Sequence, residues 1–293
     1  MEVIDSRRAW RAACDDARRD ERVLGLVPTM GALHEGHVSL VAAAAAACDR
    51  VAATIFVNPL QFGDASDLVN YPRTLESDLS MLEAAGCDLV FTPSIEEIYP
   101  GFPAPVPTSV TVSGAAEGLE GAGRPGHFDG VATVVTLLFS LTGPAKAFFG
   151  EKDFQQVAVV RQVVRDLGLP IEVVACPTLR DADGLALSSR NRRLTPEGRR
   201  AAGALHAALV AGAEAIQAGS EPAASAAVME ERLASEPMAT VSYAEVVDPI
   251  SLQRTKQRVP GASLRLLVAA EIGGVRLIDT LGAEIPATEG SPD

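Results

Sequence analysis

The stretch Val-Leu-Gly-Leu-Val-Pro-Thr-Met-Gly-Ala-Leu-His-Glu-Gly-His, residues 23–37, decides the fold expected for this chain. Five small or apolar residues open it, a turn with two glycines follows, and residues 38–48 continue as an apolar helical segment. In parallel α/β proteins, ligands bind where a strand of the sheet runs into such a turn and helix. The stretch therefore predicts the end of a parallel strand and a candidate ligand site on it.

Short β-branched runs and helical periodicity alternate through the first half of the chain. The expected strands are residues 23–27, 51–57, 89–91, 147–149 and 171–174. The expected helices are residues 38–48, 75–85, 127–141 and 154–167. This alternation predicts an α/β fold with a Rossmann-like, mostly parallel sheet and helices on both of its faces.

The sequence changes character near Arg180 and predicts a second, smaller α+β domain. Alanine-rich helices are expected at residues 196–218 and 223–235, and strands at 241–247, 264–270 and 275–280. Gly273-Gly274 joins the last two strands as a two-residue hairpin turn. We expect a Rossmann-like domain at residues 1–182, a C-terminal lid domain with an antiparallel sheet at 183–293, and a frayed tail from residue 283.

Composition and charge exclude several classes of partner. The 293 residues carry 25 Lys and Arg against 38 Asp and Glu, a net charge of -13, which would not gather nucleic acid or acidic lipid. No apolar run approaches the ~20 residues that span a bilayer, and residues 1–22 lack the apolar core of a signal peptide. The 4 cysteines form no Cys-x-x-Cys pair and are expected to be buried thiols in a reducing compartment, the cytoplasm.

The turn at residues 28–37 has the chemistry of a phosphate site. Gly31 and Gly36 let the backbone approach a ligand, and the first N–H groups of the helix that starts near Glu35 point at an anion. His34 and His37 share one face of the first helical turn. A bound triphosphate would favour their imidazolium forms, which would stabilise charge on the phosphate oxygens. The alternative is structural: His34 caps the helix and His37 packs against the sheet. A zinc hydrolase is disfavoured because its ligands come as His-Glu-x-x-His.

Neutral amides follow the second expected strand. Asn58 and Gln61 should face the same crevice as the histidines, where amides would bind the hydroxyls and carboxylate of a small polar substrate. The alternative is a set of hydrogen bonds that close the loop around Pro59. Further along, Arg124 lies in a glycine-rich segment at a helix entrance, where it could hold a carboxylate or phosphate unless the segment is an ordinary turn.

A third strand end precedes residues 150–156. Lys152 and Gln156 are four residues apart on a helical face that should point into the same crevice. Lys152 supplies a point charge for phosphate and Gln156 an amide for a hydroxyl, while Asp153 could accept from a ribose unless it is only the helix N-cap. The hydroxyls and guanidinium of residues 188–190 suit β- and γ-phosphates if the second domain closes over a nucleotide. An ordinary polar loop is the alternative there.

Taken together, these segments resemble the pantothenate synthetase (pantoate–β-alanine ligase) family of the HIGH-motif nucleotidyltransferase superfamily. The resemblance covers residues 27–37, 55–62, 71–74, 119–130, 148–156 and 187–191 in the family's order. It implies a two-step amide synthesis, in which the pantoate carboxylate attacks the α-phosphate of ATP and the β-alanine amine then displaces AMP from the pantoyl adenylate. It also implies a need for Mg²⁺ and a homodimer.

The same resemblance implies roles for individual residues. The implied catalytic group comprises His34, His37, Asn58 and Lys152, with His37 as proton donor. The implied ATP contacts comprise both histidines, Lys152, Met30, Gly150, Asp153, Leu179, Leu187, Ser188, Ser189 and Arg190. Gln61 and Gln156 are implied to clamp pantoate, Gln61 also to contact β-alanine, and further candidates are Tyr71, Glu120 and Arg124. No ligand of Mg²⁺ is assigned.

Two other functions fit parts of the pattern. A nucleotidyltransferase with the same histidine signature would move a nucleotide to a phosphate-bearing acceptor, but such an acceptor calls for more cations than the amides of Gln61 and Gln156 supply. A nucleotide-binding or interaction module would need only the glycine-rich turn and the acidic surface, and it leaves His37 unexplained. The ligase is the leading hypothesis.

Overall fold

The first half of the protein is built on one parallel sheet. The computed structural model describes residues 1–63 and 68–287, and the chain divides into two compact units, Met1–Pro177 and Thr178–Asp293. Within the described residues, the first unit holds a sheet in the order β1-β4-β3-β2-β5-β6, and each neighbouring pair is parallel. The strands are β1 Glu2–Ile4, β2 Leu24–Thr29, β3 Arg50–Ile55, β4 Leu89–Phe91, β5 Ala145–Gly150 and β6 Ile171–Cys176. The predicted Rossmann-like parallel sheet is confirmed.

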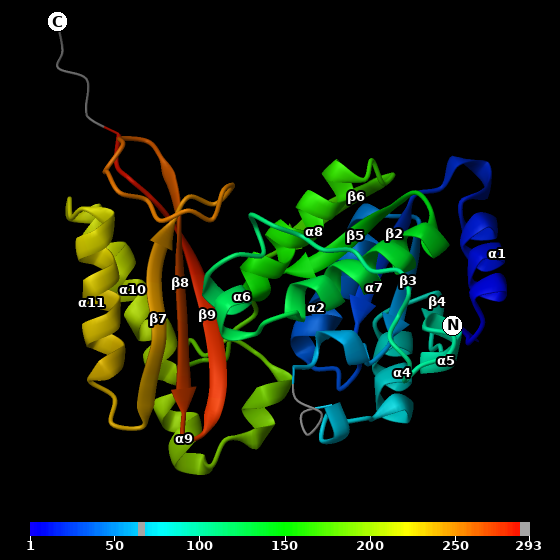
Figure 1. Ribbon diagram of the computed structural model, residues 1–293, viewed down its shortest axis with the longest axis horizontal. Helices are drawn as coiled ribbons and strands as arrows, with labels where there is room; N and C mark the ends of the chain where they lie inside the picture. Colours follow the sequence, from blue (N-terminus) through cyan, green and yellow to red (C-terminus); the bar gives the residue numbers. More distant parts are fainter. Residues whose placement is uncertain (64–67, 288–293) are drawn as a thin grey trace, which may run out of the picture. The chain divides into compact units, whose positions relative to one another are not determined.

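Helices cover both faces of this sheet (Figure 1). Successive strand residues face opposite sides, so Leu24 and Leu26 join the core on one face, whereas Val27 joins the core on the other. The first face is covered by α1 (Arg7–Ala17), α7 (His127–Thr142) and α8 (Phe154–Asp166), and the second by α2 (Glu35–Ala47) and α4 (Leu75–Ala84). The prediction of helices on both faces is confirmed.

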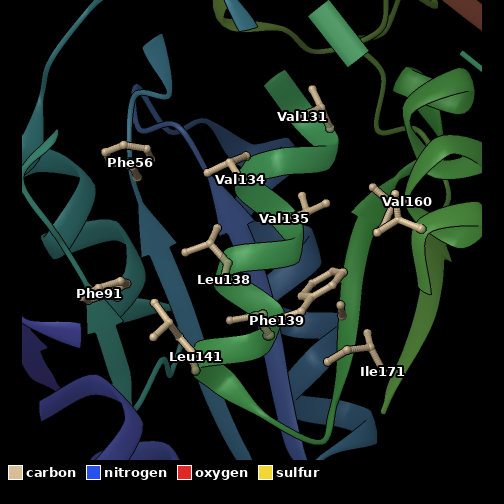
Figure 2. Packing of buried hydrophobic residues seen from close by; sticks show 14 of the residues in the cluster. Phe56, Phe91, Val131, Val134, Val135, Leu138, Phe139, Leu141, Val160 and Ile171 are labelled. Carbon is tan, nitrogen blue, oxygen red and sulfur yellow. The ribbon is translucent and has the colours of Figure 1, made fainter. Parts of the chain in front are cut away.

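Helix α7 packs into the hydrophobic core on the first face of the sheet. Figure 2 shows Leu138 and Leu141 on the side of α7 toward Phe91, and Phe139 on the side toward Ile171. All of these side chains are buried, and each contributes roughly 1.5–3 kcal/mol relative to an exposed position. This packing anchors α7 on the first face of the sheet.

The direction in which successive strands are added reverses between β2 and β5. From β2 the chain passes through α2 to β3 on one side, whereas β5, on the other side of β2, follows α7 and continues through α8 to β6. Such a reversal is the topological switch point at which parallel α/β sheets bind ligands. Residues 30–37 after β2 and residues 151–153 after β5 therefore flank the expected binding crevice.

The second unit holds an antiparallel sheet packed with helices. Strands β7 (Ala239–Val247), β8 (Ser263–Ile272) and β9 (Val275–Glu284) pair in that order and share a core with α9 (Pro196–Ala201), α10 (Gly203–Gln217) and α11 (Pro222–Ala234). The predicted hairpin is confirmed, because Gly273 and Gly274 join β8 to β9 with φ of 54° and 82°, as a type I′ turn requires. This unit begins at Thr178, whereas the sequence analysis placed the domain boundary after residue 182.

Short elements complete the first unit and the loop that follows it. The short helices of the first unit include α5 Ile95–Ile98 and α6 Leu119–Gly123. The 3-10 turns are η1 Arg19–Glu21, η2 Pro59–Gln61, η3 Glu151–Asp153 and η4 Ser189–Arg193. Turns η2 and η3 of the first unit and turn η4 of the second unit carry candidate site residues.

Parts of the chain differ from expectation. The sequence analysis interpreted residues 1–22 only as a charged segment and missed β1 and α1, although Trp10, Cys14 and Ala17 form a buried stripe at helical spacing. The helix expected at 196–218 is two helices, α9 and α10. The tail expected to fray from residue 283 packs as far as Ile285, which is 2% exposed and donates its N–H to the Ala262 carbonyl at 2.9 Å. Residues 288–293 lie outside the described part.

None of the helices in residues 1–63 and 68–287 has the length and apolarity needed to cross a bilayer. The 4 cysteines are all free thiols. Burial raises the pKa of Cys14 and of Cys87 to about 12, so both stay protonated and unreactive at neutral pH. The prediction of buried thiols is confirmed for these two and for Cys176, but it is wrong for Cys48, which is half-buried.

Candidate active site

Turns after three strands meet at the carboxyl edge of the sheet. Met30 follows β2 and Gln61 follows β3, and the Gln61 Nε2 donates to the Met30 Sδ at 2.9 Å. Lys152 and Asp153 follow β5, and both are close enough to His37 to alter its pKa. The three strand ends that the sequence analysis placed at one crevice therefore lie together.

The two histidines orient each other at the start of α2. His34 is the N-cap residue, and its Nδ1 accepts the Gly36 N–H at 3.1 Å, while the Nδ1 of His37 accepts the His34 N–H at 3.3 Å. The ring centroids lie 4.1 Å apart. Because each Nδ1 is an acceptor, the proton of each neutral ring lies on Nε2 and makes that atom a donor. Capping thus uses the Nδ1 atoms, whereas phosphate binding would use the Nε2 atoms, so the two interpretations of this pair are compatible.

The surroundings of His37 hold its ring neutral. Burial lowers the pKa of His37 to about 3, and His34 and Lys152 act in the same direction, while Asp153 opposes them. The protein therefore disfavours the imidazolium that the sequence analysis expected at this position. At neutral pH, His37 can donate a hydrogen bond from Nε2, but it brings no positive charge.

Backbone N–H groups of the turn are already paired inside the protein. Ala32 and Leu33 donate to the Asp78 carboxylate, each at 2.9 Å, and Gly31 donates to Thr29 Oγ1 at 3.2 Å. The amides at positions 34, 36 and 37 also have acceptors within the turn. The expectation that these N–H groups cradle a phosphate is therefore wrong for them. Sequence reasoning missed Asp78 altogether.

We expect His37 to make the protein sensitive to acid. Its pKa is lowered from 6.5 to about 3 by folding, so as the pH falls the unfolded chain binds this proton first. Stability is therefore full above pH 6.5 and declines toward pH 3, by on the order of 2 kcal/mol at pH 4.5. Urea unfolding of the wild type and of His37→Gln at pH 7.5 and 4.5 measures this. The variant should lose less stability between the two pH values, and equal losses would contradict the neutral ring.

Asn58 positions other groups and does not face a substrate. It is 1% exposed, and its Nδ2 donates to the Gln61 Oε1 and to the Gly130 carbonyl, each at 3.0 Å. Its Oδ1 accepts the Tyr99 hydroxyl at 2.9 Å, and burial raises the pKa of Tyr99, so that hydroxyl stays a donor. Both amide hydrogens of Asn58 are therefore used. The loop-closing alternative describes this residue, and any catalytic effect of Asn58 has to act through Gln61.

Gln61 is the amide that the surrounding network orients. Contacts to Asn58 and Met30 fix the plane of its side-chain amide. Its backbone is fixed as well, because the His127 Nδ1 lies 2.9 Å from the Gln61 carbonyl oxygen, and the Arg124 Nη1 lies 3.0 Å from the His127 Nε2. Arg124, a candidate from its sequence context, is thus linked to the strand-end site through His127.

Lys152 brings positive charge to the strand-end site. Its side chain is 14% exposed, and its Nζ lies 3.7 Å from the Asp153 Oδ1. Asp153 stands at the N-cap position of α8 without a side-chain capping bond, so the N-cap alternative accounts for its position but not for its carboxylate. Gln156 follows on the first turn of α8 and is half-buried, and Gly150 ends β5 just before the lysine.

Sequence reasoning also missed Gln155, which holds the segment around Glu120. Gln155 is 4% exposed, its Oε1 accepts the Glu120 N–H at 2.9 Å, and its Nε2 donates to the carbonyls of residues 115, 117 and 118. Glu120 itself is buried. Tyr71, the remaining candidate of this unit, packs edge-on against Phe62 with ring centroids 5.6 Å apart. These candidates therefore sit in ordered surroundings, built by residues that the sequence pattern did not single out.

Five of the candidate residues belong to the second unit. The Leu187 N–H donates to the Leu179 carbonyl at 2.9 Å. Ser188 is the N-cap residue of η4, and its Oγ accepts the Arg190 N–H at 3.3 Å. The Ser188 hydroxyl thus orders the turn that carries Ser189 and Arg190, as the alternative of an ordinary polar loop requires.

Comparison with known proteins places this chain among a group of close relatives. The model of the family described as pantoate-beta-alanine ligase matches residues 2–282. The pantothenate synthetase of Paracoccus denitrificans (strain Pd 1222) is 52% identical over 262 residues, which cover 89% of this chain and 91% of the relative. The pantothenate synthetase of Herpetosiphon aurantiacus is 50% identical over 283 residues, which cover 96% of this chain and 99% of the relative.

Solved structures share the fold over nearly the whole chain. The crystal structure of pantothenate synthetase from Thermus thermophilus matches with a TM-score of 0.88 at 46% identity and covers 96% of this chain and 99% of that one. The pantoate-beta-alanine ligase from Francisella tularensis, complexed with beta-gamma ATP and beta-alanine, matches with a TM-score of 0.76 at 32% identity and covers 96% of this chain and 97% of that one.

Proposed function

This chain belongs to the pantoate-beta-alanine ligase family, and we propose that the strand-end site of its first unit catalyses the ATP-dependent condensation of pantoate with β-alanine. The products are pantothenate, AMP and pyrophosphate. The observation that carries the proposal is the pair of histidines beside Lys152 at the switch point of the sheet. The Nδ1 of each histidine accepts a backbone N–H, which leaves its Nε2–H as a donor. Family membership favours this ligase over the nucleotidyltransferase and over the nucleotide-binding module.

The reaction activates a carboxylate that is otherwise a poor acylating agent. In the first step a pantoate carboxylate oxygen bonds to the α-phosphorus of ATP, and the bond from that phosphorus to the bridging oxygen breaks to release pyrophosphate. In the second step the β-alanine amine bonds to the pantoyl carbonyl carbon, the amine loses a proton, and AMP leaves with the former carboxylate oxygen. Holding the reactants in one crevice supplies much of the rate through orientation.

The residues of the first unit divide these tasks by their chemistry. The Nε2–H groups of His34 and His37 donate hydrogen bonds to phosphate oxygens, and the Lys152 ammonium offsets the charge that builds on them. Gln61 and Gln156 hold pantoate through its hydroxyls and carboxylate, and Gln61 also contacts β-alanine. The orientation of the Gln61 amide by Asn58 and Met30 supports the first of these roles.

The remaining candidates complete the nucleotide and amine subsites. Their assignment rests on the resemblance of the motifs, with Met30 contacting the nucleotide through its backbone. On the adenosine side we assign Gly150 and Asp153. In the second unit we assign the turn residues Ser188, Ser189 and Arg190 to the triphosphate, and Leu179 and Leu187 to the nucleotide. Tyr71, Glu120 and Arg124 are further candidates for contacts to the substrates.

Mg²⁺ fits this site as an ion that arrives with ATP. Within residues 1–63 and 68–287, no group of three or more His, Cys, Asp or Glu side chains is arranged to hold a metal. Mg²⁺ in such enzymes keeps several waters and takes substrate phosphates as ligands, so it needs only one or two carboxylates from the protein. When bound, the ion withdraws charge from the phosphates and eases the departure of pyrophosphate.

Exchange of labelled pyrophosphate into ATP tests the proposed function. Because the first step is reversible and needs only ATP and pantoate, we expect exchange to appear with pantoate alone and to be absent with β-alanine alone. Release of AMP together with pantothenate should require both substrates. Exchange that appears with β-alanine but never with pantoate would contradict the pantoyl adenylate.

Assembly and location are part of the same proposal. The resemblance to the family supports a homodimer, which sedimentation at micromolar concentration would measure directly. The 4 free cysteines, of which two have a pKa raised to about 12, suit a reducing compartment and thus the cytoplasm.

A further inference from the structure

A buried carboxylate lies beneath the histidine turn. Asp78, on α4, is 2% exposed. Its Oδ2 accepts the Ala32 N–H at 2.9 Å, and its Oδ1 accepts the Leu33 N–H at 2.9 Å and the Thr74 hydroxyl at 3.0 Å. A buried carboxylate is costly unless hydrogen bonds satisfy it. Two of these three donors are backbone groups of the turn between β2 and α2, so the acid and the turn depend on each other.

The turn is bent into a shape that receives an anion. Gly31 and Ala32 have φ of 81° and 52°, so two consecutive residues are left-handed and the N–H groups that follow them converge on one point. Ala32 is held in a conformation that residues with a side chain rarely adopt. Concavities of converging amides bind phosphates in many proteins. Here the carboxylate of Asp78 fills the concavity.

We propose that Asp78 is a positioning residue for the phosphate-binding histidines, an inference that rests on the function proposed above. Its carboxylate occupies the converging amides, keeps phosphate out of the turn, and fixes Leu33, the residue directly before His34. His34 then stands as the N-cap of α2, and its N–H orients the ring of His37. A series of contacts thus connects Asp78 on α4, through Leu33, to the Nε2–H donors of His34 and His37.

Close fit and chemistry favour this role over simple packing. A Cβ added at Gly31 would lie 3.0 Å from the Asp78 Oδ2, so the turn and the carboxylate are fitted together without spare room. Leu82, one turn further along the same face of α4, is an apolar core residue, as packing alone would require at such a position. An acid there is stable only because the turn supplies its donors.

An amide cannot replace this carboxylate. A carboxylate only accepts hydrogen bonds, and the three donors around Asp78 converge on its two oxygens. An asparagine would turn an NH₂ group toward the N–H of Ala32 or of Leu33, where two donors repel each other. The turn would move away, and the displacement would pass directly to His34.

Asp78→Asn tests the proposal, with Glu76→Gln as its matched control. Both variants replace an acid of α4 by its amide, and Glu76 is exposed. We expect kcat for pantothenate, per mole of folded protein, to fall about 10²-fold in Asp78→Asn, because displacements near 1 Å cost that much. Glu76→Gln should stay within about twofold of the wild type. Imidazole ¹⁵N spectra give a readout that a merely structural role would not move: the Nδ1 signals of His34 and His37 should shift only in Asp78→Asn.

Thr74→Val keeps the test decisive if Asp78→Asn does not fold. It removes the hydroxyl donor and leaves both backbone donors to the carboxylate, so it should shift the same histidine signals and lower kcat several-fold. Unchanged histidine signals and kcat in folded Asp78→Asn, or in Thr74→Val if the first variant is unfolded, would overturn the positioning role. A wild type that makes no pantothenate would instead overturn the proposed function, while the histidine spectra would still judge the contact between Asp78 and the turn.

Discussion

Replacement of Gly130 by alanine should lower the free energy of unfolding by about 3 kcal/mol and remove ligase activity from the protein that remains folded. A Cβ at this position of α7 would lie 2.4 Å from the carbonyl carbon and oxygen of Leu60 and 2.6 Å from the Gln61 nitrogen. These are backbone atoms, which cannot rotate away as a flexible side chain can. Either α7 or η2 has to move.

The activity should fall further than the stability because Gly130 also belongs to the site. Its carbonyl accepts from the Asn58 Nδ2 at 3.0 Å, and the same Nδ2 orients the Gln61 amide. A shift of α7 would therefore release the proposed pantoate clamp. We expect kcat/KM for pantoate to fall by at least about 10²-fold in the folded fraction.

Gly203→Ala is the matched control for this prediction. It makes the same change in helix α10, where the nearest atom to an added Cβ is 3.7 Å away, so the helix should gain up to about 0.5 kcal/mol from the loss of glycine. Urea unfolding and pantothenate formation measure both variants. A Gly130→Ala protein with wild-type stability and activity would refute the close packing of α7 on η2.

Periodicity was enough to predict the sheet and the edge on which the site lies. β2 is buried on both faces, and its run of small and apolar residues directly before a glycine turn is what a central parallel strand requires. Because parallel strands end on one edge, the residues after β2, β3 and β5 could be placed at one crevice without knowledge of the strand order. Gln61 and Lys152 were predicted as candidates in this way.

The partners of those residues could not be predicted, because burial decides them. Asp78 looks like its neighbour Glu76 in the sequence, and only its spacing of four from Leu82 indicated a face directed at the core. The hydrogen-bond partners of the Asn58 side chain include the Tyr99 hydroxyl and the Gly130 carbonyl, which are 41 and 72 residues away in the sequence. No local pattern reports such contacts, so the sequence analysis assigned Asn58 to a substrate that its amide does not face.

The protonation state of His37 in the ligand-free protein could not be predicted for the same reason. Spacing placed His34 and His37 on one face correctly, but the pKa of His37 depends on how far the ring is buried and on the charges across the crevice. A reference pKa near 6.5 made imidazolium reasonable at the sequence level. Burial lowers the pKa of His37 and keeps its ring neutral in the ligand-free protein. Positive charge therefore has to come from another residue of the first unit.

Lys152 is that residue, and Lys152→Met should lower the rate of pyrophosphate exchange about 10²- to 10³-fold. Its ammonium lies near the neutral His37, and removing it takes away a positive charge that the first unit offers to the growing negative charge on the phosphates. Lys152→Arg should restore little, because a guanidinium fork cannot replace a compact point charge in a side-chain position that is only 14% exposed.

Lys146→Met controls for the loss of a lysine from the same strand. Lys146 lies near the opposite end of β5 and pairs with Glu172 at 3.5 Å in a partly exposed position, so exchange should stay within about twofold of the wild type. The pH dependence then separates the two sources of charge. Burial is the largest cause of the lowered pKa of His37 and remains when Lys152 is replaced, so the defect of Lys152→Met should be the same from pH 6 to 8. A defect that shrinks toward pH 6 would show that an imidazolium takes over the charge, which would contradict the neutral His37 on which this assignment of roles depends.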